Sequence, residues 1–283
     1  MREEFIRTGL LLGETAMERL ARARVAVFGV GGVGGYVVEA LARSGVGALD
    51  IIDSDVVSVS NINRQIIALH STIGRYKVDV MSERIQDINP DCRVKAHRCF
   101  YLPETKDAFD FSQYDYVVDA VDTVTAKLAL VMEAEAHHVP IISSMGAGNK
   151  LDPAGFCVAD IYETSVCPLA KVMRRELKKR GVKRLKVVYS KEEARRPLQE
   201  SNLRKADSEG CDSVACEYSL GDSVTCQTSP HETAACSNIL KQERVSPQKR
   251  VTPGSTAFVP SVVGLIIASE VIHDLCGDDH ILL

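Results

Sequence analysis

The stretch Val25-Ala26-Val27-Phe28-Gly29-Val30-Gly31-Gly32-Val33-Gly34-Gly35 decides the fold of this chain. A short apolar run rich in β-branched residues ends at a group of glycines, and a segment with helical apolar spacing follows. Gly29, Gly31 and Gly34 fit the pattern G-x-G-x-x-G. Such glycines permit a tight turn, close approach of a phosphate to the backbone, and close packing of helix on strand. The pattern predicts a strand, a phosphate-binding turn that includes Gly32, and a helix within about residues 25–45.

A second apolar run, residues 49–53, ends in the acid Asp53. An acid about 20 residues beyond such a glycine pattern is placed to accept hydrogen bonds from a ribose. Because this acid follows a predicted strand, and the glycines lie between a strand and a helix, the two features together predict a nucleotide site. They do not say which nucleotide binds.

Alternating strand and helix patterns continue along the chain and predict an α/β fold. Further strands are expected at about residues 93–97, 116–122 and 140–144, and helices at about 78–88 and 126–137. Alternation of this kind is typical of a mostly parallel, Rossmann-like sheet wrapped by helices. Ligands of such sheets bind at the carboxyl ends of the strands, where Gly29, Asp53, Asp119 and Asp122 are expected.

The chain divides by pattern into a nucleotide-binding core, residues 1–150, and a smaller C-terminal extension, residues 151–283, that completes the same domain. The extension contains expected strands at about 156–161 and 185–189 with a basic helix between them, and an apolar helix at about 262–275. Residues 194–250 are polar and lack any period, which predicts a disordered insertion.

Bulk composition restricts the class of protein. The net charge of −4 over 283 residues argues against a globally basic nucleic-acid binder, although a local basic patch is compatible with it. No apolar run approaches membrane-spanning length, and the first residues do not resemble a signal peptide. Nine cysteines without an export signal predict reduced thiols, and hence a cytoplasmic protein without a membrane partner.

A group of polar and charged residues beyond the second strand suits a triphosphate. Amide and cationic side chains would neutralise phosphate oxygens, and a carboxylate would supply a hard oxygen for magnesium. A nicotinamide dehydrogenase does not need this set, whereas attack on an α-phosphate does. Besides Asp53, the group comprises Asp55, Asn61, Arg64, Gln65, Lys77 and Asp122.

These motifs, in this order over about residues 5–150, resemble the signatures of the ThiF/MoeB-type, ubiquitin-activating-like adenylating enzymes. Further stretches, among them Arg7–Glu14, Gly146–Pro153 and Gly254–Ser261, are similar to the tRNA threonylcarbamoyladenosine dehydratases within that family. The family's last motif often reads Asp-Asn, and here Thr123 follows Asp122.

The resemblance implies ATP-dependent adenylation of the carboxylate of N6-threonylcarbamoyladenosine beside a tRNA anticodon, followed by ring closure that expels AMP, a net dehydration. It implies that Asp53 holds ribose, that Asn61, Arg64 and Lys77 hold phosphates, and that Asp122 holds magnesium. It also implies a homodimer in which Arg7 reaches the partner's site, and it leaves open a partner from a cysteine-desulfurase system.

A basic segment follows the core. Nine of the sixteen residues from Lys171 to Lys186 are Lys or Arg. On a helix, Lys171, Arg174, Arg175, Lys178 and Lys179 would form a broad basic face. That face suits the phosphate backbone of tRNA, and a merely solvated helix face fits equally well.

Three other functions fit parts of the sequence. Relatives that activate a ubiquitin-like or sulfur-carrier protein at its C-terminus often hold structural zinc with two C-x-x-C pairs, and this chain has none. Its loosely spaced Cys211, Cys216, Cys226 and Cys236 favour free thiols. A nicotinamide dehydrogenase is disfavoured by Arg64 and Asp122, and a scaffold that binds ATP without turnover remains open.

Overall fold

The computed structural model of the protein describes residues 2–198 and 253–277. Residues Met1–Arg195 and Gly254–Leu283 form one compact unit, and Arg196–Pro253 form a second. The predicted insertion at 194–250, with its four cysteines, lies mostly outside the described residues. Its disorder, and the division of the chain at residue 150, stay predictions.

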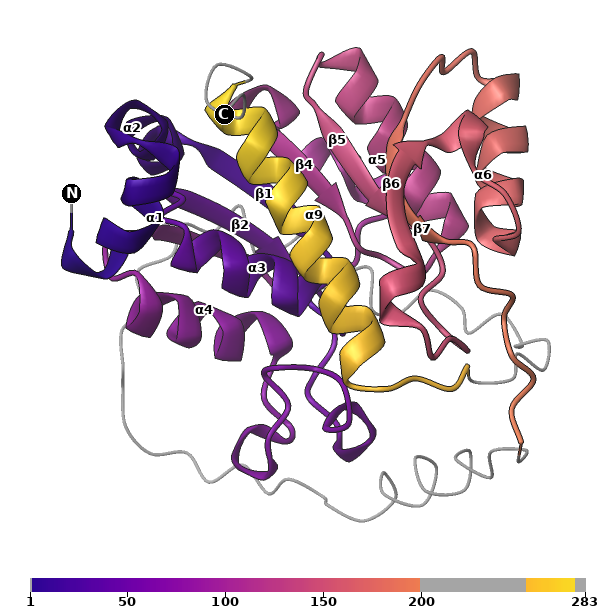
Figure 1. Cartoon of the computed structure of the whole chain (residues 1–283), viewed down its shortest axis with the longest axis horizontal. Coiled ribbons are helices and arrows are strands. Elements are labelled where there is room, and N and C mark those ends of the chain that lie inside the picture. Colours follow the sequence, from indigo (N-terminus) through magenta and orange to yellow (C-terminus); the bar gives the residue numbers. More distant parts are fainter. Residues whose placement is uncertain (1, 199–252, 278–283) are drawn as a thin grey trace, which may run out of the picture. The chain divides into compact units, whose positions relative to one another are not determined.

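A seven-stranded sheet forms the centre of the first unit, in the order β3-β2-β1-β4-β5-β7-β6 (Figure 1). Neighbouring strands run parallel except β6, which is antiparallel to β7. The strands are β1 Arg24–Phe28, β2 Ala48–Ile52, β3 Arg93–His97, β4 Tyr116–Asp119, β5 Ile141–Ser144, β6 Phe156–Asp160 and β7 Lys186–Ser190. This topology confirms the predicted Rossmann-like, mostly parallel fold.

Helices cover both faces of the sheet. Helices α3, α4 and α9 lie on one face, and α5 and α6 on the other (Figure 1). The helices are α1 Ile6–Leu12, α2 Glu14–Arg22, α3 Gly34–Arg43, α4 Lys77–Ile88, α5 Val124–Ala136, α6 Pro168–Lys179 and α9 Phe258–Cys276.

The alternation of side chains along β1 explains why both faces need a cover. Val25 and Val27 join the core beneath α3 and α9, whereas Ala26 and Phe28 join the aromatic core beneath α5. Because successive strand residues point to opposite faces, an apolar run such as this one is stable only when it is buried on both sides.

Most element boundaries agree with the predicted ones to within about two residues, and two larger differences have a physical cause. Strand β4 ends at Asp119 rather than at residue 122, because the chain turns away where the Asp119 carboxylate accepts a hydrogen bond from the Val121 N–H at 3.2 Å. Helix α9 begins at Phe258, before the predicted 262–275, since Pro260 lies in its first turn, where a missing N–H costs nothing.

Helix α9 has 19 residues and a mean hydropathy of 1.6, so by length and composition it is long and apolar enough to cross a membrane. The expectation that no apolar run approaches that length is therefore wrong for this helix. In the structure α9 packs along α3, and its residues Val263, Ile267 and Val271 are fully buried. Those contacts make α9 a core helix of this fold.

Candidate active site

The glycine turn lies at the carboxyl end of β1 and leads into α3. Gly29 has a φ of +92°, and a Cβ there would lie 2.6 Å from the Ala120 carbonyl oxygen. A Cβ on Gly34 would lie 1.7 Å from the Gly29 carbonyl oxygen. Both positions therefore require glycine. No side chain caps the N-terminus of α3, so its first N–H groups are available to an anion.

Asp53 lies beside this turn, as the sequence predicts. Its carboxylate accepts hydrogen bonds from the Val30 N–H at 2.8 Å and the Asp55 N–H at 2.9 Å. Burial raises the pKa of the Asp53 carboxyl, and Lys77 together with these two N–H groups acts in the opposite direction. A carboxylate offers about four acceptor sites, so Asp53 retains capacity for the hydroxyl groups of a ribose.

Lys77 is the first residue of α4 and is only 5% exposed. Its Nζ lies 2.7 Å from an Asp55 carboxylate oxygen and 3.9 Å from Asp53. The side chain of Asp55 is 58% exposed. A phosphate can therefore replace the Asp55 carboxylate as the partner of Lys77, because the Asp55 side chain can rotate toward the solvent.

The loop before α4 carries three predicted residues, Asn61, Arg64 and Gln65, and brings the last two to the glycine turn. The Asn61 carbonyl accepts hydrogen bonds from the backbone N–H groups of Arg64 and Gln65. Arg64 donates from Nη1 to the Ser60 carbonyl at 2.9 Å and to the Asn63 side chain at 2.8 Å, and no described residue takes its Nε or Nη2. The Gln65 side-chain nitrogen lies 3.8 Å from where a Cβ on Gly31 would be.

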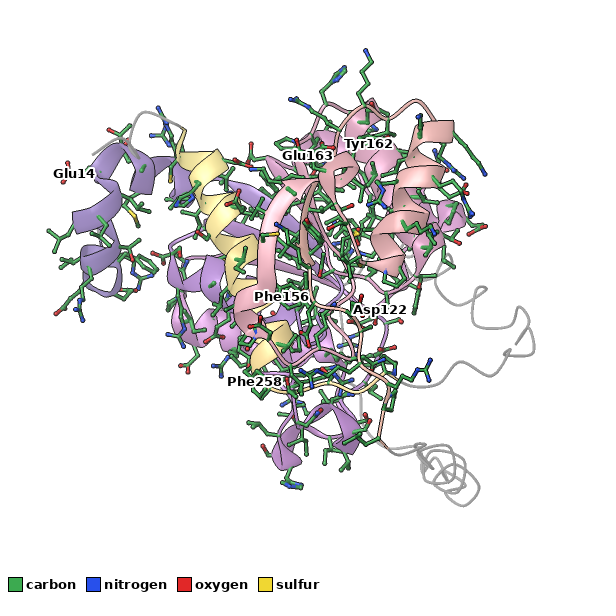
Figure 2. All side chains as sticks on the ribbon, turned by 45° about the vertical axis from the view of Figure 1, so that its right-hand side comes forward. Glu14, Asp122, Phe156, Tyr162, Glu163 and Phe258 are labelled. Atoms are coloured by element: carbon green, nitrogen blue, oxygen red, sulfur yellow. The ribbon has the colours of Figure 1, made fainter. Side chains whose placement is uncertain are left out.

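Asp122 and Asp119 have different surroundings although both follow β4. Asp122 is exposed, and no described residue gives its carboxylate a hydrogen bond or an ion pair. Asp119 is fully buried and pairs with the Lys127 Nζ at 3.0 Å. Asp122 is therefore available to a ligand and Asp119 is not. In Figure 2, Asp122 lies toward the same end of the sheet as Phe156 and Phe258, away from Tyr162 and Glu163.

A chain segment far away in the sequence completes this end of the sheet. Gly254 exchanges hydrogen bonds with Asn149, whose carbonyl also accepts one from the Arg195 N–H at 2.8 Å. The Asn63 amide donates to the Ser255 carbonyl at 3.0 Å. Sequence reasoning gave this segment no role, and the only signal for it was the resemblance over Gly254–Ser261.

Two buried side-chain oxygens near these loops have no hydrogen-bond partner. They are Gln65 Oε1 and Thr256 Oγ1, and among the described side chains only Tyr101 shares this property. An unpartnered buried polar atom costs free energy. Gln65 lies against the glycine turn, and Thr256 follows Ser255, so the site as it stands leaves polar groups to be satisfied there.

Arg7 is the predicted site residue that this chain does not bring to the others. It is exposed on α1, and the neighbouring Phe5 packs on Gly45 at the amino end of β2. That is the opposite edge of the sheet from the glycine turn. Helix α1 also exposes Leu10 and Leu11, which are 80% and 85% accessible.

The predicted basic face of α6 is smaller than expected. Arg174 turns inward and donates to the Thr164 carbonyl at 2.6 Å. Hydrogen bonds from Arg180, Lys179 and Arg175 lower the pKa of the Glu176 carboxyl to about 2. The basic face that remains exposed consists of Lys171, Arg175, Lys178 and Lys179.

Similarity to known proteins extends over nearly the whole chain. A tRNA threonylcarbamoyladenosine dehydratase of Bacillus subtilis (strain 168) is 39% identical over 291 residues, which is 99% of this chain and 98% of that protein. The same enzyme of Escherichia coli (strain K12) is 37% identical, over 85% of this chain and 93% of that protein.

Solved structures agree with the sequences. The crystal structure of E. coli TcdA in complex with AMP has a TM-score of 0.76 and 30% identity, and the match covers 97% of this chain and 94% of that chain. The complex with ATP has a TM-score of 0.75. The ThiF family profile matches residues 6–282. With the glycine turn, the adjoining acid and the buried lysine in place, the chain belongs to the ThiF family.

Proposed function

We propose that this protein is an ATP-dependent tRNA threonylcarbamoyladenosine dehydratase. One observation carries the proposal: the buried Lys77 lies beside the glycine turn and Asp53, and a half-buried Arg64 and a free Asp122 carboxylate flank the same turn. Two cations and one hard oxygen around a phosphate turn are the groups that an attack on an α-phosphate requires.

The reaction has two steps. A carboxylate oxygen of the threonylcarbamoyl group attacks the α-phosphorus of ATP, and pyrophosphate leaves. An attack from within the same side chain on the activated carbonyl then expels AMP and closes the ring. Asp53 orients the ribose, and Asn61 holds the loop that carries Arg64. Lys77 and Arg64 neutralise the charge that develops on the phosphates.

Magnesium fits this donor set. Among the described residues, no group of three or more His, Cys, Asp or Glu side chains could hold a metal ion. Magnesium does not need such a cage, because it commonly binds through one or two carboxylates together with substrate phosphates and water. Asp122, with its free carboxylate, is the residue that would hold it, and the bound ion would neutralise the departing pyrophosphate.

A homodimer would give Arg7 a role. Its position at the opposite edge of the sheet excludes contact with its own site, and the exposed Leu10 and Leu11 provide an apolar face for a second copy. Mixing Arg7→Ala subunits with Lys77→Ala subunits should then restore activity, because half of the sites in a mixed dimer receive both intact residues. Failure to complement would count against this arrangement.

The tRNA substrate would lie across the carboxyl edge of the sheet and α6. Helix α6 begins at that edge, where Cys167 Sγ lies 3.8 Å from where a Cβ on Gly146 would be, and its basic face extends from there along the helix. Such contacts position a nucleic acid without reading its sequence. A reaction on tRNA would also place the enzyme in the cytoplasm. A cysteine-desulfurase partner stays a prediction.

The first experiment incubates the protein with α-labelled ATP and magnesium, with tRNA that carries threonylcarbamoyladenosine or with the same tRNA carrying plain adenosine. We expect AMP only with the modified tRNA, together with loss of one water from the modified nucleoside. Asp122→Asn should abolish both signals. AMP formation that requires a small carrier protein instead would overturn the proposal in favour of carrier activation.

A further inference from the structure

A fully buried ion pair lies beneath the Asp122 loop. Lys127 is 1% exposed and Asp119 is 0% exposed. The Lys127 ammonium donates to both Asp119 carboxylate oxygens, at 3.1 and 3.0 Å, and to the Ser144 carbonyl at 2.7 Å. The Ser143 hydroxyl donates to Asp119 as well.

This network joins three elements at the carboxyl edge of the sheet. Asp119 ends β4, Lys127 lies in the first turns of α5, and Ser143 and Ser144 end β5. Each end leads into a loop of the candidate site. Residues 120–123 carry Asp122 and approach Gly29, and residues 145–149 carry Asn149, which bonds Gly254.

Stability alone does not explain the pair. Removing two charges from water is costly, and replacing a buried ion pair by apolar side chains of similar volume is often neutral or stabilising. Lys127 is also unable to touch a substrate, because it is almost completely buried and its three N–H donors are taken up by Asp119 and Ser144. Its contribution must act through other residues.

We propose that Asp119 and Lys127 are positioning residues for adenylation. Through hydrogen bonds to the ends of β4 and β5, they hold the loops 120–123 and 145–149 so that the Asp122 carboxylate faces a nucleotide at the glycine turn. Asp119 fixes the first loop directly, since it accepts from the Val121 N–H. This inference rests on the proposed function for its effect on turnover, but not for its effect on the loops.

The test compares the single variant Lys127→Met with the double variant Asp119→Leu/Lys127→Met. The single variant leaves a buried unpaired carboxylate and should be unstable, whereas the double variant removes both charges and should regain thermal stability. In the double variant we expect kcat for AMP formation to stay about 10- to 100-fold lower, the usual effect of losing an outer-shell support. The KM for ATP should change little, and amide hydrogen exchange should be faster in 120–124 and 145–150.

Lys186→Met is the matched control, because Lys186 also pairs with carboxylates, Asp274 at 2.7 Å and Glu270 at 3.1 Å, but lies at the start of β7 on the other edge of the sheet. This variant should change neither kcat nor exchange in the two loops. Hydrogen exchange needs no tRNA, so failure of the proposed function and failure of this inference give different results.

A double variant with restored stability, wild-type kcat and wild-type loop exchange would overturn the inference. If the double variant does not fold, Ser143→Ala decides, because it removes one hydrogen bond from Asp119 and leaves both charges in place. Faster exchange in 145–150 together with lower kcat supports the positioning role, and unchanged values for both contradict it.

Discussion

At Gly264, helix α9 lies directly against the start of α3, and Gly264→Ala tests whether this contact supports the nucleotide turn. A Cβ on Gly264 would lie 2.5 Å from the Val33 carbonyl oxygen and 2.8 Å from the Tyr36 Cβ. Neither atom can rotate away, since the first is backbone and the second is fixed to it. The two helices must therefore separate.

The magnitude follows from two opposing effects. Overpacking costs about 1–3 kcal/mol, and contact with backbone places this site near the upper value. Replacing glycine by alanine within a helix returns about 1 kcal/mol. The net loss of unfolding free energy should be about 2 kcal/mol, which lowers Tm by about 4–8 °C in a unit of this size.

Thermal and urea denaturation measure this loss, and titration with ATP measures its second consequence. Because Val33 precedes the first residue of α3 and belongs to the glycine turn, the variant should also bind ATP more weakly. Leu265→Ala is the control, since that neighbouring side chain is 49% exposed and should change stability by less than about 0.5 kcal/mol. An unchanged or raised Tm for Gly264→Ala would refute the packing argument.

Three further predictions concern charge. Burial alone would raise the pKa of Asp50, but hydrogen bonds from His97 and Arg24 outweigh burial and lower this pKa. The ionised Asp50 carboxylate therefore stabilises the fold at pH values above its pKa in the unfolded chain. This stabilisation is lost as the pH falls through its pKa in the folded protein. Asp50→Asn should cost about 3 kcal/mol at pH 7, and urea denaturation should show the difference from wild type shrinking below about pH 4. Lys77→Met should lower single-turnover AMP formation at least about 100-fold while the far-ultraviolet circular dichroism stays native; a rate near wild type would remove Lys77 from the site. Changing the basic face of α6 (Lys171, Arg175, Lys178 and Lys179) to Glu should weaken tRNA binding and reduce its dependence on salt concentration. Filter binding at several salt concentrations measures both, and an unchanged affinity would contradict a role of α6 in binding tRNA.

The sequence predicted the features that depend on local pattern. The glycine turn and Asp53 are separated by one strand–helix unit, and residue spacing within such a unit fixes their distance. The helix predicted to follow Gly74–Lys77 and end at Ile88, and the strand predicted at about 93–97, agree closely with α4 and β3. The predicted end of β4 at residue 122 was wrong, because the turn there depends on a side-chain hydrogen bond of Asp119 that apolar pattern does not reveal.

Sequence pattern did not predict the features that depend on contacts between distant parts of the chain. Lys127 lies on the apolar face of a predicted helix, and a charged residue at such a position indicates a buried partner. The sequence could not identify that partner, because Asp119 and Ser144 belong to two separate strands. The contact of Gly254 with Asn149 joins residues 105 positions apart in the sequence, which local pattern does not reveal. Arg7 was predicted as a site residue by resemblance alone, and the structure places it at the opposite edge of the sheet from the glycine turn.

The hydrogen bonds of Asn149 bring together two parts of the chain that are far apart in the sequence. Arg195 and Gly254 both bond the same residue, so the chain leaves the core and re-enters it at almost one point. A linker of a few residues would span that gap, and loop-closure entropy rises only slowly with the number of residues inserted. Shortening or grafting the chain between these two anchor points should therefore leave the sheet of the first unit undisturbed.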